Sequence, residues 1–459
     1  MQMDDTNNNS LTIVMYPWFA MGHLTAFLHM ANKLADRGNK IFFLLPKKTQ
    51  AQLEQFNLYP NLINFITLSV PQVEGLPPNA EITADIPFLL QPHLRLAMDR
   101  TKPLVESILQ EIKPHFVFFD FTHWLPALSR RIGIKSIFFI TMSPATAAYT
   151  FRKEQTAPDI DTMKAPPPGF PSSCIKLYSH EAYGLNFAGN VKDIGSEMSF
   201  LQRLLISAED CDAIGFKACR EMEGLYCEYI KREFKKPVLL AGPVVPEQPT
   251  TTLEEKWAKW LDGFKEKSVI FCALGSECRL RKDQFQELLL GFELCGLPFF
   301  AALKPPMGIE TIEMALPKGF KERTQGRGII YGDWVQQQLI LAHSSVGCFV
   351  THCGSGSLSE GLMSECQMVL LPQFGDQFIN SRLMSGDLRV GVEVEKGDED
   401  GLFTKDGVCK AIREVIDEGN EVGKEVKVNH FKWRDFLLRK GLESSYIHEF
   451  ITKLRGLLN

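Results

Sequence analysis

The amino-acid sequence predicts an α/β protein built from two tandem, doubly wound domains. Short apolar runs alternate with amphipathic stretches along the chain, which is typical of strands alternating with helices. The runs are apolar at successive positions, as in parallel strands that are buried on both faces. The alternation stops at a Pro-rich stretch near the middle of the 459 residues and then starts again. Because domains hold roughly 100–200 residues, this length also favours two domains.

The first half contains five predicted strands with helices between them. The strands are expected at residues 11–18, 40–46, 64–70, 115–121 and 135–141. Helices with one apolar face are expected at residues 23–37, 93–112 and 124–132. Further along the chain, three consecutive prolines predict that residues 165–169 form an irregular loop.

Three prolines and a glycine within residues 240–249 indicate a linker between domains. Beyond it, strands are expected at residues 269–274, 299–303, 328–334, 347–352, 368–372 and 390–394. Helices are expected at residues 282–295, 357–364 and 377–384. The predicted organisation is an N-terminal domain, a linker, a C-terminal domain and a last helix that packs back on the N-terminal domain, at residues 1–241, 242–252, 253–442 and 443–459.

Composition excludes several classes of function. Fifty Lys and Arg against 55 Asp and Glu give a net charge of −5, whereas nucleic-acid binding needs a basic surplus. No apolar run reaches the roughly 18 residues that a membrane span needs, and the N-terminus is too acidic and polar for a secretory signal. The 11 cysteines are odd in number and scattered, which favours buried thiols. We therefore expect a cytoplasmic protein without nucleic-acid partners.

A turn of small residues follows the strand at 347–352. His352 leads into Cys-Gly-Ser-Gly-Ser at 353–357, where a helix should begin. Backbone N–H groups at such a helix start can bind a phosphate, and His352 and Ser357 could add donors. Ser357 and Glu360 also have the spacing of a capping box, which needs no ligand. The turn lacks a dinucleotide-binding glycine pattern and a Walker lysine, so NAD and ATP are disfavoured.

His23 and Asp120 each follow a predicted strand at the same edge of the first domain. A carboxylate that fixes the imidazole tautomer makes histidine a base for deprotonating a hydroxyl. The alternative is that His23 caps a helix and Asp120 merely ends its strand. No His or Cys spacing suggests zinc, and we predict no metal site.

Residues 334–377 have a more specific pattern. The segment WVQQQLILAHSSVGCFVTHCGSGSLSEGLMSECQMVLLPQFGDQ resembles the 44-residue donor-binding box of plant family 1 glycosyltransferases, which use UDP-sugars. The opening PWFAMGHLTAFLHMANKLADRG, the LAGPVVP linker and the ALGSE turn are also similar to this family. The resemblance implies the GT-B fold, in which two Rossmann-like domains face a cleft.

The resemblance also implies roles for individual residues. Trp334 should stack on uracil, the Val335 backbone should contact its edge, and Gln337 and Glu360 should bind the ribose. The diphosphate should be held at the start of the helix by His352, Ser357 and the backbone of Gly354, Ser355 and Gly356.

Four further residues are assigned by the same resemblance. Ser276, in the ALGSE turn, should reach the diphosphate from another loop. Asp376 and Gln377 should bind the transferred sugar, with Thr141 helping from the first domain.

The implied mechanism is a single displacement with inversion. His23 would remove the acceptor proton and Asp120 would stabilise the resulting imidazolium. The UDP-sugar would be a co-substrate, with no metal or other cofactor, and the enzyme is expected to be a monomer.

The sequence departs from the family at Ser355 and Gly356, where most members have Trp-Asn. This variant resembles the branch that adds sugars to flavonoid or other small glycosides, such as an anthocyanidin 3-glucoside. Gln377 favours UDP-glucose, with UDP-rhamnose or UDP-xylose as alternatives. Two alternatives remain. The enzyme could glycosylate an aglycone directly, or the protein could be a catalytically silent homologue that binds UDP-sugars.

Overall fold

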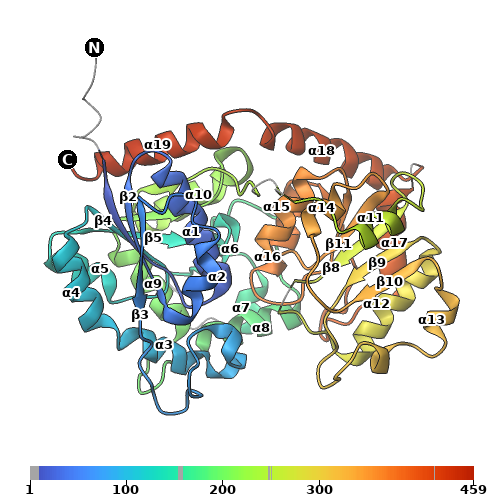
Figure 1. Cartoon of the computed structure of the whole chain (residues 1–459), viewed down its shortest axis with the longest axis horizontal. Helices are drawn as coiled ribbons and strands as arrows, with labels where there is room; N and C mark the ends of the chain where they lie inside the picture. Colours follow the sequence, from blue (N-terminus) through green and yellow to red (C-terminus); the bar gives the residue numbers. More distant parts are fainter. Residues whose placement is uncertain (1–9, 154–158, 247–248, 250, 276, 418) are drawn as a thin grey trace. The chain divides into compact units, whose positions relative to one another are not determined.

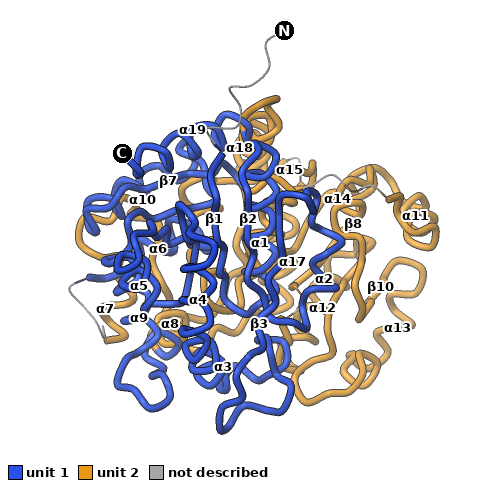
Figure 2. The backbone as a smooth tube through the Cα atoms, turned by 60° about the vertical axis from the view of Figure 1, so that its left-hand side comes forward, with its two compact units in different colours: residues 1–157, 187–243, 443–459 blue, residues 158–186, 244–442 orange. Residues whose placement is uncertain are grey.

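The chain forms two units, which Figure 2 shows in different colours. A computed structural model describes residues 10–153, 159–246, 249, 251–275, 277–417 and 419–459. Unit 1 comprises Met1–Ala157, Phe187–Pro243 and Glu443–Asn459, and unit 2 comprises Pro158–Asn186 and Val244–Leu442. These units differ from the predicted domains at residues 158–186, which lie within the predicted N-terminal domain but pack with unit 2.

Unit 1 is built on a seven-stranded, all-parallel sheet in the order β3-β2-β1-β4-β5-β6-β7. Its strands are β1 Thr12–Tyr16, β2 Lys40–Pro46, β3 Ile63–Leu68, β4 Phe116–Phe119, β5 Lys135–Ile140, β6 Ala213–Phe216 and β7 Val238–Leu240. The five strands predicted for this half are confirmed. Sequence reasoning missed β6 and β7, although they are no shorter than β4 and β13, which were predicted.

Helices lie around this sheet in Figure 1. The main ones are α1 Met21–Ala35, α2 Gln50–Glu54, α3 Gln91–Asp99, α4 Lys102–Ile112, α5 Leu125–Arg131, α6 Pro144–Thr150, α9 Phe200–Asp210, α10 Arg220–Phe234 and α19 Leu442–Gly456. The single helix predicted at 93–112 is wrong, because the chain forms α3 and α4 instead. Pro103 has no N–H to donate one turn back, and a continuous helix cannot pass through it without a break.

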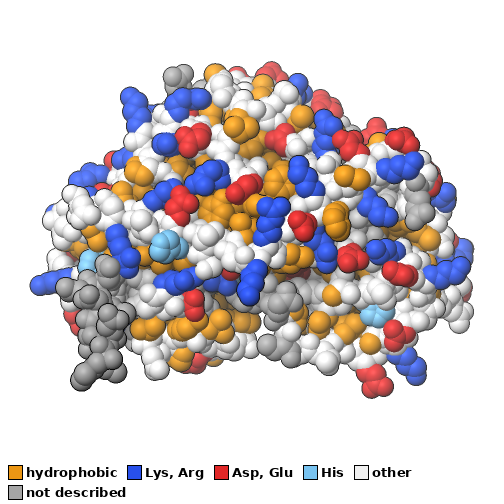
Figure 3. Space-filling view, turned by 90° about the horizontal axis from the view of Figure 1, so that it is seen from above, with side chains coloured by type: hydrophobic (Ala, Val, Ile, Leu, Met, Phe, Trp, Pro, Cys, Tyr) orange, Lys and Arg blue, Asp and Glu red, His pale blue; other side chains and the backbone are white. Residues whose placement is uncertain are grey.

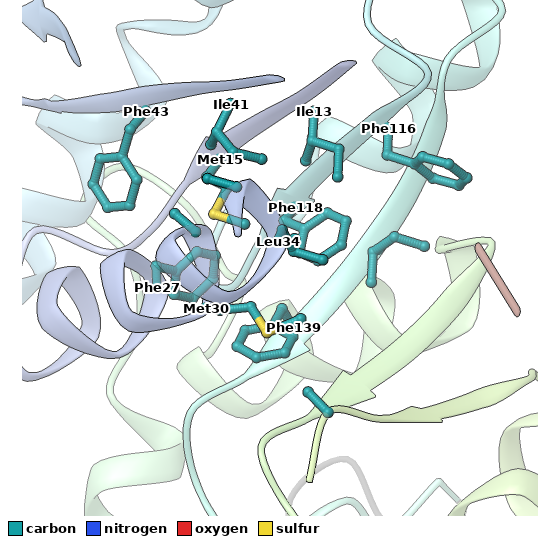
Figure 4. Close-up of a cluster of buried hydrophobic side chains, with 14 of the residues drawn as sticks. Ile13, Met15, Phe27, Met30, Leu34, Ile41, Phe43, Phe116, Phe118 and Phe139 are labelled. Atoms are coloured by element: carbon teal, nitrogen blue, oxygen red, sulfur yellow. The ribbon is translucent and has the colours of Figure 1, made fainter. Parts of the chain in front are cut away.

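The strands of unit 1 are buried on both faces, as their apolar runs predicted. Ile13 and Met15 point to the side where α1 packs, in the cluster drawn in Figure 4. Their neighbour Tyr16 is also fully buried, and its hydroxyl lies 2.6 Å from the Thr101 hydroxyl at the start of α4. Alternation along the strand therefore places successive side chains in two separate apolar layers.

Unit 2 has a six-stranded, all-parallel sheet in the order β10-β9-β8-β11-β12-β13. Its strands are β8 Val269–Ala273, β9 Phe299–Ala302, β10 Gly328–Tyr331, β11 Val346–Thr351, β12 Gln367–Leu370 and β13 Gly391–Glu393. All six predicted strands of this half are confirmed. Its helices are α7 Ile160–Lys164, α8 Ser179–Asn190, α11 Glu255–Leu261, α12 Lys282–Cys295, α13 Phe320–Arg323, α14 Gln337–Leu341, α15 Ser355–Met363, α16 Gln377–Arg382, α17 Lys405–Ile416 and α18 Glu421–Leu437.

Each sheet has one place where the direction of winding reverses. In unit 1 this place lies between β1 and β4, where Tyr16 pairs with Phe119. In unit 2 it lies between β8 and β11, where Ala273 pairs with Thr351. Because ligands of doubly wound sheets bind beyond the carboxyl ends of such strands, the loops after these four strands are the first places to look for a site.

The surface carries mixed charges, in keeping with the small net charge. Figure 3 shows one face on which Lys and Arg side chains are interspersed with Asp and Glu. Of the helices in the described part of the chain, none combines the length and apolar character needed to cross a bilayer.

The last helix, α19, is attached to unit 1 by apolar packing and by one partly buried carboxylate. Phe450 and Leu454 are fully buried in the same cluster as β1 and α1. Glu443 lies 3.0 Å from Lys33 Nζ and 2.5 Å from Lys217 Nζ. Burial alone would raise the pKa of Glu443, but contacts with His29 and with both lysines hold that pKa well below its usual value.

The substitution Glu443→Gln is expected to lower the free energy of unfolding by about 1–2 kcal/mol at pH 7. The effect is limited to this size because the Glu443 side chain is only partly shielded from water. Because the pKa of Glu443 is lowered by folding, its contribution is present above roughly pH 4.5 and is lost as the pH falls further. Urea unfolding at pH 7 and pH 4 measures this, with the more exposed Glu449→Gln on the same helix as the control. An equal effect of the two substitutions would contradict the assignment.

Candidate active site

The structure brings His23 and Asp120 together at the winding reversal of unit 1. His23 lies in the first turn of α1, and Asp120 directly follows β4. His23 Nδ1 is 2.6 Å from Asp120 Oδ2. The Asp120 side chain is 1% exposed, whereas that of His23 is 21% exposed. The interpretation that His23 only caps a helix is therefore wrong, because its ring is paired with a buried carboxylate.

This geometry fixes the tautomer of His23. A carboxylate is an acceptor only, so the proton on the imidazole must sit on Nδ1 to make the 2.6 Å contact. The lone pair is then on Nε2, the nitrogen that can accept a proton. The pair can act as a general base, with Asp120 stabilising the imidazolium that forms.

Two neighbouring residues hold the histidine ring in place. The Phe121 ring lies edge-on to the His23 ring, with 5.0 Å between centroids. The hydroxyl of Thr141, directly after β5, lies 3.2 Å from His23 Nδ1. Thr141 was predicted to contact the transferred sugar, and the structure places its hydroxyl against the His23–Asp120 pair.

A buried cluster of charges supports the loop that carries Asp120. The Asp120 carboxylate accepts a hydrogen bond from its neighbour Phe121 N at 2.7 Å. Arg203, which is 1% exposed, donates to Phe121 O at 3.0 Å and to both oxygens of Asp99 at 2.9 and 2.6 Å. Asp193 accepts from Arg203 Nε at 3.0 Å and from Arg95 Nε at 2.7 Å. Two cations and two anions thus fix the backbone beside the pair.

In unit 2, three of the predicted nucleotide residues form one hydrogen-bonded group. Gln337 Nε2 donates to Ser357 Oγ at 3.1 Å and to Glu360 Oε2 at 2.6 Å. Gln338 Nε2, which sequence reasoning missed, lies 3.3 Å from Glu360 Oε1. Burial raises the pKa of Glu360, and the two glutamines oppose this effect. Their contacts hold a carboxylate in one orientation, as an acceptor for ligand hydroxyls requires.

Two other residues predicted to bind the nucleotide lie in the loop after β10. Trp334 is 77% exposed, which is unusual for an aromatic ring of its size. Val335 is buried, and its carbonyl accepts from Gln337 N at 2.8 Å. The exposed indole is available for stacking, while the backbone beside it is held by α14.

His352 is packed between two glycines at the winding reversal of unit 2. A Cβ atom on Gly354 would lie 2.6 Å from His352 Nε2, and one on Gly275 would lie 2.7 Å from it. Both positions therefore exclude any side chain while the ring stays in place. Burial lowers the pKa of His352 to about 4, so the imidazole is neutral at pH 7 and acts as an uncharged hydrogen-bonding group.

Helix α15 begins earlier than predicted, and this excludes the capping-box interpretation. Its first residue is Ser355 and its N-cap is Gly354, which has no side chain to bond the first turn. Ser357 lies inside the helix, and the Glu360 carboxylate contacts Gln337 and Gln338 instead. The N–H groups of the first turn, including those of Ser355 and Gly356, thus have no side-chain cap.

The residues predicted to bind the sugar lie at the start of α16. Gln377 Oε1 accepts from Gln373 N at 3.0 Å and from Phe374 N at 3.2 Å, which closes the loop in front of the helix. Asn380, which was not predicted, donates to Asp376 Oδ2 at 3.1 Å and to Cys353 O at 3.2 Å. Its spacing of four residues from Asp376 within a helix is the signal that could have identified it.

Ser276, predicted to reach the diphosphate, lies outside the described residues. Among those that are described, no group of three or more His, Cys, Asp or Glu side chains is placed to hold a metal ion.

A Gly354→Ala substitution is expected to displace the His352 ring toward solvent, because its Cβ would overlap Nε2. The pKa of His352 should then rise from about 4 toward its ordinary value near 6.5. Imidazole nitrogen shifts, followed by NMR across a pH titration, measure this. Gly356→Ala is the matched control for ring position, because the Cβ it would add lies more than 4 Å from the His352 ring. An unchanged His352 pKa in Gly354→Ala would contradict the packing argument.

Comparison with known proteins identifies the family. The model described as UDP-glucoronosyl and UDP-glucosyl transferase matches residues 313–428, and that described as Glycosyltransferase, N-terminal domain matches residues 9–116. The chain is 56% identical over 453 residues to cyanidin 3-O-galactoside 2''-O-xylosyltransferase of Actinidia chinensis var. chinensis, covering 97% of this chain and 98% of the relative.

A second relative and a solved structure agree with this result. Anthocyanidin 3-O-glucoside 2''-O-glucosyltransferase of Ipomoea nil is 54% identical over 451 residues, covering 97% of this chain and 98% of the relative. The structure of Phytolacca americana apo UGT2 matches with a TM-score of 0.79 at 21% identity, covering 97% of this chain and 100% of that chain. This chain belongs to the plant family 1 UDP-dependent glycosyltransferases and has their two-domain GT-B fold.

Proposed function

We propose that this glycosyltransferase adds a sugar from a UDP-sugar to a hydroxyl of a sugar already carried by a small flavonoid-type glycoside, such as an anthocyanidin 3-O-glucoside. The observation that carries the proposal is the 2.6 Å contact between His23 and Asp120, which supplies a base for a hydroxyl. Two relatives above 50% identity, named as 2''-O-glycosyltransferases of cyanidin and anthocyanidin 3-glycosides, support the acceptor class. We also propose a cytoplasmic, monomeric enzyme that needs no metal or further cofactor.

The reaction is a single displacement at the anomeric carbon. Nε2 of His23 takes the proton of the acceptor hydroxyl as its oxygen attacks, and the configuration of that carbon inverts. The buried Asp120 stabilises the imidazolium through its contact with Nδ1. Phe121 and Thr141 keep the ring from turning, so the acceptor meets Nε2 in one orientation.

UDP is the leaving group, and unit 2 carries the groups that bind it. Trp334 stacks on uracil, the Val335 backbone contacts its edge, and Glu360, held by Gln337, accepts from the ribose hydroxyls. The first turn of α15 directs N–H groups at the diphosphate as its negative charge grows. His352 contributes as a neutral donor, since its pKa of about 4 leaves it uncharged at pH 7.

Glucose is the favoured donor sugar, bound by Asp376 and Gln377. The Gln377 oxygen already accepts two backbone hydrogen bonds, so its amide N–H groups are the part offered to the sugar. Xylose is the alternative that a relative supports, because the Actinidia relative is named a xylosyltransferase. A pentose lacks one hydroxymethyl group, and such a difference is worth only about 1–3 kcal/mol in a binding site.

Ser355 and Gly356, which replace the Trp-Asn pair of most family members, are consistent with a bulky acceptor. Apart from its chain neighbours and the backbone of α15, nothing lies within 4 Å of the position that a Cβ of Gly356 would take. Gly356 therefore leaves open space where most family members have a larger side chain, and we propose that this space admits the sugar of the acceptor glycoside.

His23→Ala is expected to abolish transfer, because a positioned base contributes roughly 10²–10⁴-fold to rate. The Kd for UDP should stay near that of the wild type, since UDP is bound in unit 2. Steady-state turnover and calorimetric titration with UDP measure the two quantities. Turnover close to the wild-type rate in His23→Ala would show that His23 is not the base.

A donor-by-acceptor matrix, read by mass spectrometry, tests the substrate class. We expect cyanidin 3-O-glucoside to be glycosylated with a kcat/KM at least about tenfold above that of cyanidin, and UDP-glucose to exceed UDP-xylose and UDP-rhamnose. A preference for the aglycone would overturn the acceptor proposal. Binding of UDP-sugars without product from any acceptor would instead favour the catalytically silent homologue.

A further inference from the structure

The segment at residues 158–186 is attached to unit 2 although it lies within the N-terminal half of the sequence. Ser172 Oγ donates to Asp387 Oδ1 at 2.7 Å, and Ser179 Oγ donates to Asp398 Oδ2 at 2.6 Å. Glu181, at the start of α8, forms the deepest of these contacts, because its side chain is fully buried. The question is what a buried carboxylate from this segment does in unit 2.

Glu181 forms an ion pair with Arg382 in which both carboxylate oxygens contact one guanidinium nitrogen. Arg382 Nη2 lies 2.9 Å from Glu181 Oε1 and 3.0 Å from Oε2. The other guanidinium nitrogen, Nη1, donates to Glu393 of β13, which also accepts from Ser385. With its guanidinium held between two carboxylates, the Arg382 side chain has one available position.

Lys396 is the second cation of the same group. Its ammonium donates to the carbonyl of Pro372. Burial lowers the pKa of Lys396 to about 8, while the charges of Glu181 and Glu393 act in the opposite direction. Glu181, Arg382, Glu393 and Lys396 thus form a balanced group of two anions and two cations, which we call the four-charge cluster.

The four-charge cluster holds both ends of the segment that carries the proposed sugar-binding residues. Arg382 is the last residue of α16, whose first residue is Gln377. Pro372 lies at the opposite end, just before the loop that Gln377 closes with Gln373 and Phe374. A shift of either cation would therefore move the loop and the start of α16 together.

Buried ion pairs contribute little net stability, because the cost of removing charges from water offsets their attraction. Their geometric effect is larger, since Glu181 binds the Arg382 guanidinium at Nη2 while Glu393 binds it at Nη1, which restricts both its position and its orientation. The cluster is therefore better suited to fixing the position of residues 372–382 than to stabilising the fold.

We propose that Glu181 is a positioning residue for the donor sugar: through Arg382 and the four-charge cluster, it sets the location of Asp376 and Gln377. This inference rests on the proposed function, in which these two residues bind the transferred sugar. It assigns part of donor recognition to a residue that precedes the donor-binding box by more than 150 positions in the sequence.

The test separates binding of the sugar from binding of the nucleotide. Glu181→Gln keeps the shape of the side chain but removes its charge. We expect its Kd for UDP-glucose to rise about tenfold while its Kd for UDP stays within about twofold, because only the sugar contacts move. Calorimetric titration with the two ligands measures both values. The matched control is Glu395→Gln, a 78% exposed carboxylate beside the same strand, which should change neither.

A double variant distinguishes positioning from general destabilisation. Glu181→Gln leaves one uncompensated cation, whereas Glu181→Gln with Lys396→Met is balanced again. We expect the double variant to recover most of any loss in Tm but not the affinity for UDP-glucose. Recovery of both would mean that the residue acts only through stability.

The outcomes also separate this inference from the proposed function. If the wild type binds UDP-glucose no more tightly than UDP and transfers no sugar, the proposed function fails. If the wild type transfers sugar and Glu181→Gln retains the wild-type ratio of the two Kd values, the positioning role of Glu181 is wrong while the function stands.

Discussion

The organisation of both units depends on one constraint of parallel sheets, the reversal of winding direction. Where the strand order reverses, the connections that follow two adjacent strands lead to opposite sides of the sheet. The carboxyl ends of these two strands are therefore left uncovered. In unit 1 these strands are β1 and β4, which precede His23 and Asp120. In unit 2 they are β8 and β11, which precede Gly275 and His352. The order of the strands therefore determines where in each unit a binding or catalytic site can form.

Each unit also uses a balanced group of buried charges to hold the loop that bears its polar residues. Arg203 in unit 1 donates to the carbonyl of Phe121, next to Asp120, and its charge is matched by Asp99 and Asp193. Arg382 in unit 2 is matched by Glu181 and Glu393. Loops need such support because they lack the ladder hydrogen bonds of strands, while a catalytic or binding group must be held closely in position.

Much of the fold could be predicted from the sequence because apolar runs report burial directly. Eleven of the thirteen strands in the described part of the chain were predicted from this pattern. The two that were missed, β6 and β7, have lengths similar to those of β4 and β13, so length alone does not explain the difference. The pairing of His23 with Asp120 could also be predicted, since both residues follow strands at the same edge of a sheet. The motif at 334–377 predicted nucleotide-binding residues by resemblance, which no pattern of hydropathy would have done.

What could not be predicted depends on contacts between residues distant in sequence. The position of Thr141 against His23 requires the actual order of β4 and β5 in the sheet. The start of α15 at Ser355 removed the capping box that the spacing of Ser357 and Glu360 allowed. The attachment of Glu181 to Arg382 joins residues 201 positions apart, and neither residue has an unusual neighbourhood in the sequence.

The route of the chain between the units has a consequence for protein engineering. By the unit boundaries, the chain changes unit four times: between residues 153 and 159, and at residues 186–187, 243–244 and 442–443. A hybrid enzyme joined only at the central linker would pair Arg382 from one parent with the residue at position 181 from the other. Hybrids meant to exchange donor preference between relatives should therefore transfer residues 158–186 together with 244–442, and return to the first parent for the final helix.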